Sequence, residues 1–307
     1  MSTFRRPAKG DEPALSSDQM PQAPPAGTSA PARKRRGLRL SMFPTMLTLG
    51  NLVCGVLAIS YVADATGLFS AGETAKAQDH LVRGGWLILL GMVFDALDGR
   101  VARLTRSTTN FGGALDSLSD LVTFGVAPAL IAKTIVERTL GAPDVRMAFV
   151  TAAFFAVCAA LRLARYNAEH DEPDQAVQHF NGLPTPGAAG VIAGLAIAHA
   201  SLLARWPLEE RGRMIAAGVL QFGFLLCLGL CMVSRVPYVH FANRFLSGRR
   251  PIGSIALLVL TVVLAMQFEF AHVVAAGFLA YALSGPLLVI PRLIRGKREE
   301  VVPELFE

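Results

Sequence analysis

Residues 94–103 read Phe-Asp-Ala-Leu-Asp-Gly-Arg-Val-Ala-Arg, and residues 112–120 read Gly-Gly-Ala-Leu-Asp-Ser-Leu-Ser-Asp. The first segment ends a long apolar stretch with two carboxylates, and the second opens another apolar stretch with two more. A carboxylate at the centre of a bilayer costs roughly 2.5–3.5 kcal/mol, and less toward the interface. If these stretches cross a membrane, the four carboxylates need a strong compensating partner, and a divalent cation is the obvious one.

The apolar stretches around these carboxylates are long enough to cross a membrane. Hydrophobic residues make up 52% of the 307 residues, more than a soluble fold of this length hides. Because a spanning helix needs roughly 20 apolar residues, we expect an all-α, multi-pass membrane bundle of about eight helices. Their predicted ranges are 42–63, 81–103, 112–135, 147–168, 184–204, 214–234, 252–268 and 271–290.

Basic residues orient this predicted bundle. Cytoplasmic loops of membrane proteins carry an excess of Lys and Arg. Most of the 29 basic residues fall on one side if both termini and the even-numbered loops are cytoplasmic. We therefore expect both termini, and the four aspartates, at the cytoplasmic face of the cell (inner) membrane. The same bias explains the +6 net charge, so no nucleic-acid partner is expected.

The two ends of the chain differ from its middle. Residues 1–36 are rich in Pro, Ala, Ser and charge, without an apolar period, which predicts a disordered basic tail. Its last basic cluster either orients the first span or lies on the membrane surface and gathers anionic lipid, to which the chain is expected to bind. We expect the membrane domain at 37–298 and a short C-terminal tail at 299–307.

Helical spacing predicts that the carboxylates converge. Asp98 follows Asp95 by three residues and Asp120 follows Asp116 by four, so each pair shares one helix face. All-oxygen ligation suits Mg²⁺ or Mn²⁺ rather than zinc. Four carboxylates can hold two such ions roughly 3.5–4 Å apart, an arrangement that clamps a phosphate.

Three residues that follow the Asp95–Asp98 pair, Gly99, Ala102 and Arg103, suit a nucleotide. Gly99 and Ala102 share the carboxylate face and have no large side chain, so a flat nucleotide can pack there. Arg103, about two turns after Asp95, is placed to offer a bidentate fork to phosphate oxygens.

The complete pattern, D-x2-D-G-x2-A-R-x8-G-x3-D-x3-D from Asp95 to Asp120, resembles the signature of the CDP-alcohol phosphatidyltransferases without a departure. The resemblance implies that Asp95, Asp98 and Asp116 bind one ion, and that Asp95, Asp116 and Asp120 bind the other. It implies Asp120 as the general base. The residues implied to contact the CDP-lipid are Gly99, Arg103, Thr109, Pro44, Thr45, Thr48 and Asn51.

Flanking segments bear on the acceptor alcohol. Residues 121–125 follow the last aspartate without the lysine that is usual in the glycerol-phosphate enzymes of the family. Residues 161–167 and 180–186 resemble segments of its membrane-embedded bacterial phosphatidylserine synthases. This resemblance implies CDP-diacylglycerol and L-serine as substrates, phosphatidylserine and CMP as products, and a homodimer. Choline, glycerol 3-phosphate and inositol remain alternative acceptors.

Four polar residues on the predicted cytoplasmic side are candidates for serine binding: Arg162, Arg165, Asn167 and Asn181. Serine presents a carboxylate that suits a guanidinium and an ammonium that suits oxygen acceptors. Our hypothesis is that Arg165, with Asn167 or Asn181, orients serine. The alternative is that both arginines only orient the helix or extend to the interface.

A transporter is the rival from another class, because buried acidic groups also mark ion paths. That interpretation predicts carboxylates near the middle of the membrane. It does not account for Gly99, Ala102, Arg103 and Gly112 at fixed offsets from the aspartates.

Overall fold

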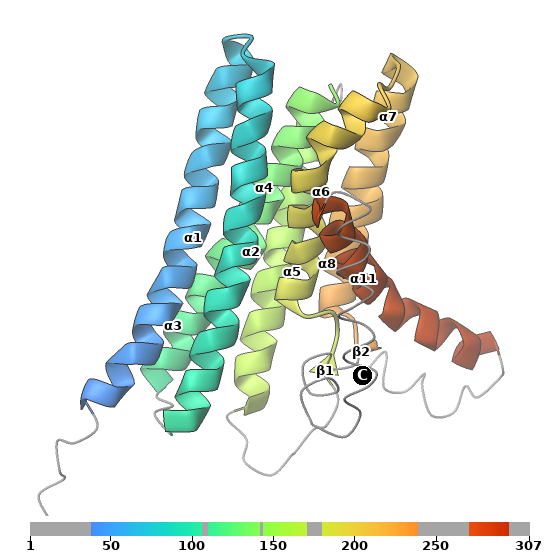
Figure 1. Ribbon diagram of the computed structural model, residues 1–307. Coiled ribbons are helices and arrows are strands. Elements are labelled where there is room, and N and C mark those ends of the chain that lie inside the picture. The colour runs from blue at the N-terminus through green and yellow to red at the C-terminus, as the bar shows by residue number, and fades with distance from the viewer. Residues whose placement is uncertain (1–37, 106–109, 142–143, 171–179, 239–269, 295–307) are drawn as a thin grey trace, which may run out of the picture. The chain divides into compact units, whose positions relative to one another are not determined.

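The computed structural model describes residues 38–105, 110–141, 144–170, 180–238 and 270–294 (Figure 1). Within these ranges the chain is helical apart from turns and one pair of two-residue strands, which confirms the all-α prediction. The helices and strands are α1 (Leu38–Ser70), α2 (Thr74–Thr105), α3 (Asn110–Asp120), η2 (Leu121–Val126), α4 (Ala127–Thr134), η3 (Ile135–Thr139), α5 (Val145–His170), β1 (Phe180–Asn181), α6 (Thr185–Arg205), α7 (Glu210–Gly218), η4 (Val219–Leu226), α8 (Cys227–Val233), β2 (Pro237–Tyr238) and α11 (Phe270–Ile294).

Six helical stretches of the described chain are long and apolar enough to cross a membrane, and they coincide with the first six predicted spans. They are Pro44–Ser70, Thr74–Val101, Phe111–Thr139, Val145–Ala168, Thr185–Arg205 and Glu210–Val233. The seventh predicted span, 252–268, and both predicted tails lie outside the described residues. The eighth coincides with α11, which has a shorter apolar stretch, His272–Leu287.

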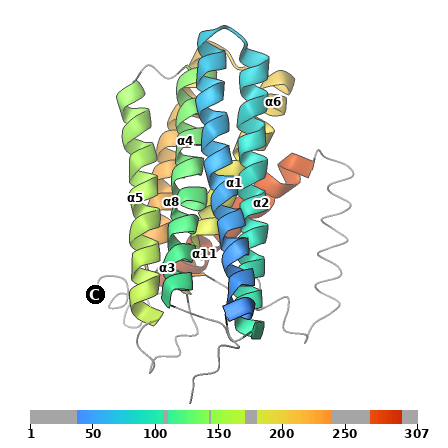
Figure 2. The ribbon, with the colours of Figure 1, turned by 90° about the vertical axis from the view of Figure 1, so that its left-hand side faces the viewer.

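Helices α1 and α2 form a long antiparallel hairpin (Figures 1 and 2). They extend past the predicted ranges because the polar, alanine-containing residues between the apolar stretches also form helix. The turn between them contains Gly72 at φ +79°, a left-handed conformation that favours glycine. The N–H of Glu73 closes the turn on the carbonyl oxygen of Leu68 at 2.9 Å.

The third span is the most buried of the six. It runs as one rod through α3, η2, α4 and η3, and it packs against α1, α2, α5 and α6. Two of its segments, η2 and η3, are π-helical. The first of these begins directly after Asp120, and π-helical turns often mark functional sites.

Because successive spans alternate in direction, one end of the bundle gathers several helix termini. The C-terminal parts of α2, α5 and α8 lie there with the N-terminal parts of α1, α3 and α6 (Figures 1 and 2). We call this the carboxylate end. Strands β1 and β2 also lie there and pair antiparallel, with Phe180 opposite Tyr238 and Asn181 opposite Pro237.

Candidate metal and substrate site

Three of the predicted carboxylates meet between α2 and α3. Asp95 and Asp98 of α2 and Asp116 of α3 each offer one oxygen, and these oxygens lie within 4.8 Å of one another. Asp98 is buried and the other two are half-buried. None of the ion pairs found among the described residues includes these carboxylates. The local negative charge therefore needs a partner from outside the described residues.

Asp120 lies beside this group without belonging to it. It is buried and interacts electrostatically with Asp95, Asp116 and Asp98. Its Oδ1 accepts a hydrogen bond of 2.9 Å from Nδ2 of Asn51 in α1. The structure thus places all four predicted carboxylates in one neighbourhood, where their negative charges repel one another.

Three of the four carboxylates, Asp95, Asp98 and Asp116, lie within about two helical turns of an end of their span, and Asp120 lies deeper. Asp98 is close to the end of the span at Val101, and Asp116 is close to the start of the next span at Phe111. A transporter with carboxylates at the middle of the membrane does not have this arrangement.

Two residues of α1 that were predicted to contact the CDP-lipid, Thr48 and Asn51, are hydrogen-bonded to carboxylates. Thr48 Oγ1 donates to Asp98 Oδ2 at 2.9 Å and also contacts the Pro44 carbonyl at 3.2 Å. Asn51, fully buried, donates to Asp120. The sequence could not reveal these pairs because they depend on how α1 packs against two other helices.

Two hydroxyls that sequence reasoning missed join α1 to the third span. Ser119 Oγ donates to the Thr48 carbonyl oxygen at 3.0 Å, and Thr123 Oγ1 donates to the Asn51 carbonyl oxygen at 2.9 Å. A signal for them existed in the sequence. Positions 116, 119, 120 and 123 follow the helical i, i+3, i+4, i+7 pattern and so share one face with the two aspartates.

Two glycines allow the helices to approach at this level. A Cβ at Gly55 of α1 would lie 2.9 Å from the Thr123 Cα, and a Cβ at Gly91 of α2 would lie 2.7 Å from the Thr123 Cγ2. Both distances are shorter than real Cβ contacts. Small residues at these positions therefore bring α1, α2 and η2 together one turn from the carboxylates.

The structure describes only some of the residues predicted to contact the CDP-lipid. Gly99 is exposed, and a Cβ added there would meet no described atom within 4 Å. Thr45 is half-buried near the start of α1. The side chains of Ala102 and Arg103, and all of Thr109, lie outside the described residues.

The predicted serine residues occupy different places at the carboxylate end. Asn167 Nδ2 donates to Oγ of Ser117, the neighbour of Asp116, at 2.8 Å. Arg165 Nη1 donates to the Val233 carbonyl oxygen at 3.4 Å, at the end of α8. Among the predicted serine-binding residues, Asn167 is therefore the one that a hydrogen bond between described residues joins to α3, the helix of Asp116 and Asp120.

Arg162 and Asn181 lie on the α6 side of this end. Arg162 is buried, donates from Nη1 to Thr185 Oγ1 at 2.9 Å, and interacts electrostatically with Tyr281 of α11. Asn181 belongs to β1, and its side chain lies outside the described residues. Gly182 follows at φ +90°, where an added Cβ would lie 2.7 Å from the Ser234 carbonyl oxygen.

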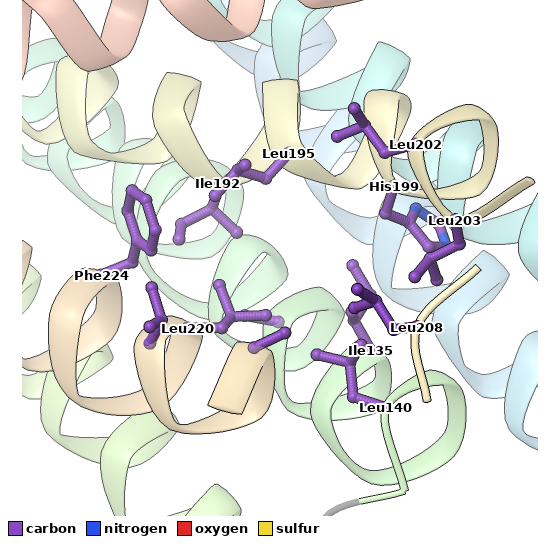
Figure 3. Close-up of a pocket in the computed structure, with 13 residues that line it drawn as sticks. Ile135, Leu140, Ile192, Leu195, His199, Leu202, Leu203, Leu208, Leu220 and Phe224 are labelled. Atoms are coloured by element: carbon purple, nitrogen blue, oxygen red, sulfur yellow. The ribbon is translucent and has the colours of Figure 1, made fainter. Parts of the chain in front are cut away.

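An apolar cavity of about 250 Å³ has none of the four aspartates in its lining (Figure 3). We call it the distal cavity. Its lining comes from α4, η3, α6, α7, η4 and the segments that flank them, and it contains one titratable side chain, His199. His199 Nδ1 bonds to the Ala196 carbonyl of its own helix. With no carboxylate in its lining, this cavity does not suit metal-dependent chemistry.

The donor set at the carboxylate end fits a hard divalent cation. All candidate ligands are carboxylate oxygens, which suit Mg²⁺ or Mn²⁺. Oδ1 of Asp116 is buried without a hydrogen-bond partner among the described residues, so it is available as a ligand. A cation offsets both this unsatisfied oxygen and the repulsion among the four carboxylates.

A family model described as CDP-alcohol phosphatidyltransferase matches residues 41–228. The CDP-diacylglycerol–serine O-phosphatidyltransferase of Helicobacter pylori (strain J99) is 29% identical over 85% of this chain and 97% of its own length. The enzyme of that name from Methanocaldococcus jannaschii is 30% identical over 68% of this chain and 78% of its own. The one from Saccharomyces cerevisiae is 43% identical over 40% of this chain and 45% of its own. The chain therefore belongs to the CDP-alcohol phosphatidyltransferase family.

Proposed function

We propose that this protein transfers the phosphatidyl group of CDP-diacylglycerol to L-serine and so forms phosphatidylserine and CMP. The observation that carries the proposal is the convergence of four carboxylates at one end of a membrane bundle, in a chain that matches the family over residues 41–228. The choice of serine is supported by relatives from bacteria, an archaeon and yeast that are named for that acceptor.

Metal binding is assigned to the aspartates. Asp95, Asp98 and Asp116 would hold one Mg²⁺ or Mn²⁺ ion, which the spacing of their oxygens supports. Asp95 and Asp116 with Asp120 would hold a second. When bound, such ions would neutralise the negative charge on the pyrophosphate oxygens.

Asp120 is proposed as the general base. Since its Oδ1 accepts a hydrogen bond from Asn51, its other carboxylate oxygen is left to take the proton of the serine hydroxyl. The serine oxygen then forms a bond to the phosphorus that carries diacylglycerol. The bond from that phosphorus to the oxygen of CMP breaks, and CMP leaves with the electron pair.

Substrate contacts are assigned to both sides of the carboxylates. The residues proposed to contact the CDP-lipid are Gly99, Ala102, Arg103, Thr109, Thr45, Thr48 and Asn51, and the open space at Gly99 supports this. Arg162, Arg165, Asn167 and Asn181 are proposed to orient serine. The bond from Asn167 to the neighbour of Asp116 supports that assignment.

The proposal includes a cellular setting. The chain would lie in the cell (inner) membrane as a homodimer, with the carboxylate end and both termini at the cytoplasmic face. The phosphatidylserine formed would then stay in the inner leaflet.

Acceptor competition tests the proposal. Purified protein in lipid nanodiscs is given CDP-diacylglycerol, Mn²⁺ or Mg²⁺, and serine, choline, inositol or glycerol 3-phosphate in turn, and CMP release is measured. Release with serine alone is expected, whereas release with another acceptor and not with serine would overturn the substrate assignment. Chelation is expected to stop turnover and added metal to restore it; activity that survives chelation would remove the metal from the mechanism.

A further inference from the structure

We infer that Ser119 and Thr123 are positioning residues that set the orientation of Asp98 and Asp120 through α1. The inference deepens the proposed function, on which it rests for its activity assay. The structure shows two hydrogen-bonded relays of the same form. In each, a hydroxyl of the third span binds a backbone carbonyl of α1, and the α1 residue that owns this carbonyl donates its side chain to a carboxylate.

The first relay begins at Ser119. Its hydroxyl binds the Thr48 carbonyl oxygen at 3.0 Å, and the Thr48 hydroxyl donates to Asp98 Oδ2 at 2.9 Å. This relay runs from α3 through α1 to α2. It therefore ties the orientation of a carboxylate on α2 to the position of α3.

The second relay begins at Thr123. Its hydroxyl binds the Asn51 carbonyl oxygen at 2.9 Å, and the Asn51 amide donates to Asp120 Oδ1 at 2.9 Å. Both Thr123 and Asn51 are 0% exposed, so water does not compete for these bonds. Asp120, the proposed base, is thereby oriented by Asn51, and the position of Asn51 is in turn fixed by Thr123.

These hydroxyls differ from a buried hydroxyl that bonds within its own helix. A Ser or Thr inside a helix commonly bonds a carbonyl of its own preceding turn, as Thr151 of α5 does with Met147 at 2.9 Å. Ser119 and Thr123 instead use the second lone pair of a carbonyl on another helix. Bonds of this kind fix the separation of two helices, which bonds within one helix do not.

The packing around Thr123 strengthens the inference. Gly55 of α1 and Gly91 of α2 both face Thr123, and a Cβ on either glycine would collide with it. The π-helical segment η2, which contains Thr123, begins directly after Asp120. Thr123 thus occupies the junction of three helices that carry the carboxylates and their donors.

Thr123→Val tests the second relay, because it removes the hydroxyl and nearly keeps the shape. Turnover with CDP-diacylglycerol and serine is expected to fall about tenfold in kcat, with both KM values within about twofold, because misplaced groups lose rate more than binding. The affinity for Mn²⁺ alone, followed by electron paramagnetic resonance, is expected to fall about threefold or more, since outer-shell partners tune metal ligands. Thr123→Ser, which retains the hydroxyl, is expected to restore both values.

Thr151→Val is the matched control, since Thr151 is also buried but bonds only within α5. It is expected to leave kcat and Mn²⁺ affinity unchanged. If Thr123→Val equals Thr151→Val in both measurements, or raises KM without lowering kcat, the inference is overturned. If Thr123→Val does not yield folded protein, Thr123→Ala and Ser119→Ala replace it with the same expected losses.

The two proposals fail separately. If wild type releases no CMP with serine, the proposed function fails, while the Mn²⁺ measurement still decides the relay. If wild type is active and the Thr123 variants match it in kcat and in Mn²⁺ affinity, the relay fails and the proposed function stands.

Discussion

The carboxylate end and the distal cavity end of the bundle satisfy buried polar groups in different ways. At the carboxylate end, buried hydroxyl and amide groups bond across helices, from α1 to α2 and to the third span. Toward the other end, the Lys133–Glu137 ion pair of 2.7 Å closes along a single span, and His199 Nδ1 bonds within its own helix. A bond across helices there, between Ser201 Oγ and His272 Nε2, is long at 3.5 Å and only part-buried.

Bonds within one helix and bonds between helices therefore have different structural effects. A bond that closes within one helix satisfies a polar group but leaves that helix free to shift against its neighbours. A bond between helices also fixes their relative position, which a site built from three helices requires. We therefore expect changes at the carboxylate end to affect turnover, and changes at the distal cavity end to affect stability.

The largest effect is expected from Asp116→Ala. Turnover should fall more than about a hundredfold, because even outer-shell partners of metal ligands contribute about 10–100-fold. CMP release and Mn²⁺ titration measure it. The matched control at the other end is Glu137→Gln, another half-buried carboxyl, which should keep turnover within about twofold and lower stability by about 1–2 kcal/mol in a thermal scan. Turnover retained in Asp116→Ala would remove that residue from the site.

Gly55→Ala should have the next largest effect. The new Cβ would lie 2.9 Å from the Thr123 Cα, so α1 and η2 must move apart, and turnover should fall about tenfold to a hundredfold. Gly67→Ala is the control in the same helix, because a Cβ there meets nothing within 4 Å. It should leave turnover unchanged and raise stability by up to about 1 kcal/mol. Equal turnover in the two variants would contradict the close-packed junction.

Arg162→Gln should act on one substrate. Loss of the guanidinium is expected to raise KM for serine about tenfold and to leave KM for CDP-diacylglycerol near its wild-type value, because a charge-assisted bond to the serine carboxylate is lost. Steady-state kinetics with each substrate varied in turn measure both. Arg205→Gln, at the exposed end of α6, serves as the control without an expected change. An unchanged serine KM would assign Arg162 a structural role, such as its bond to Thr185, rather than a contact with serine.

The smallest effect is expected from His199→Leu. Nε2 of His199 is buried and has no hydrogen-bond partner among the described residues, so a leucine removes an unsatisfied polar atom from an apolar lining. Turnover should stay within about twofold and the melting temperature should rise by a few degrees at most. A thermal scan and the CMP assay check this. A large loss of turnover would mean that the distal cavity contributes to the reaction.

The local sequence determined the helical membrane class, the first six spans and the candidate carboxylates. Apolar runs of spanning length need no partner to be recognised, since the bilayer itself selects them. The three- and four-residue spacings put each aspartate pair on one face because helical geometry is local. These predictions did not depend on how any two helices pack.

Only the tertiary structure decided which groups hold the aspartates. Thr48 and Asn51, which the family resemblance implies as CDP-lipid contacts, also bond Asp98 and Asp120 over separations of 50 and 69 residues. Ser119 and Thr123 reach α1 over 71 and 72 residues. Such pairs depend on the angle and spacing of three helices, which glycines such as Gly55 allow but local periodicity does not specify. The π-helical turn after Asp120 and the extension of α1 to Ser70 likewise arise from packing and helix continuity rather than from apolar length.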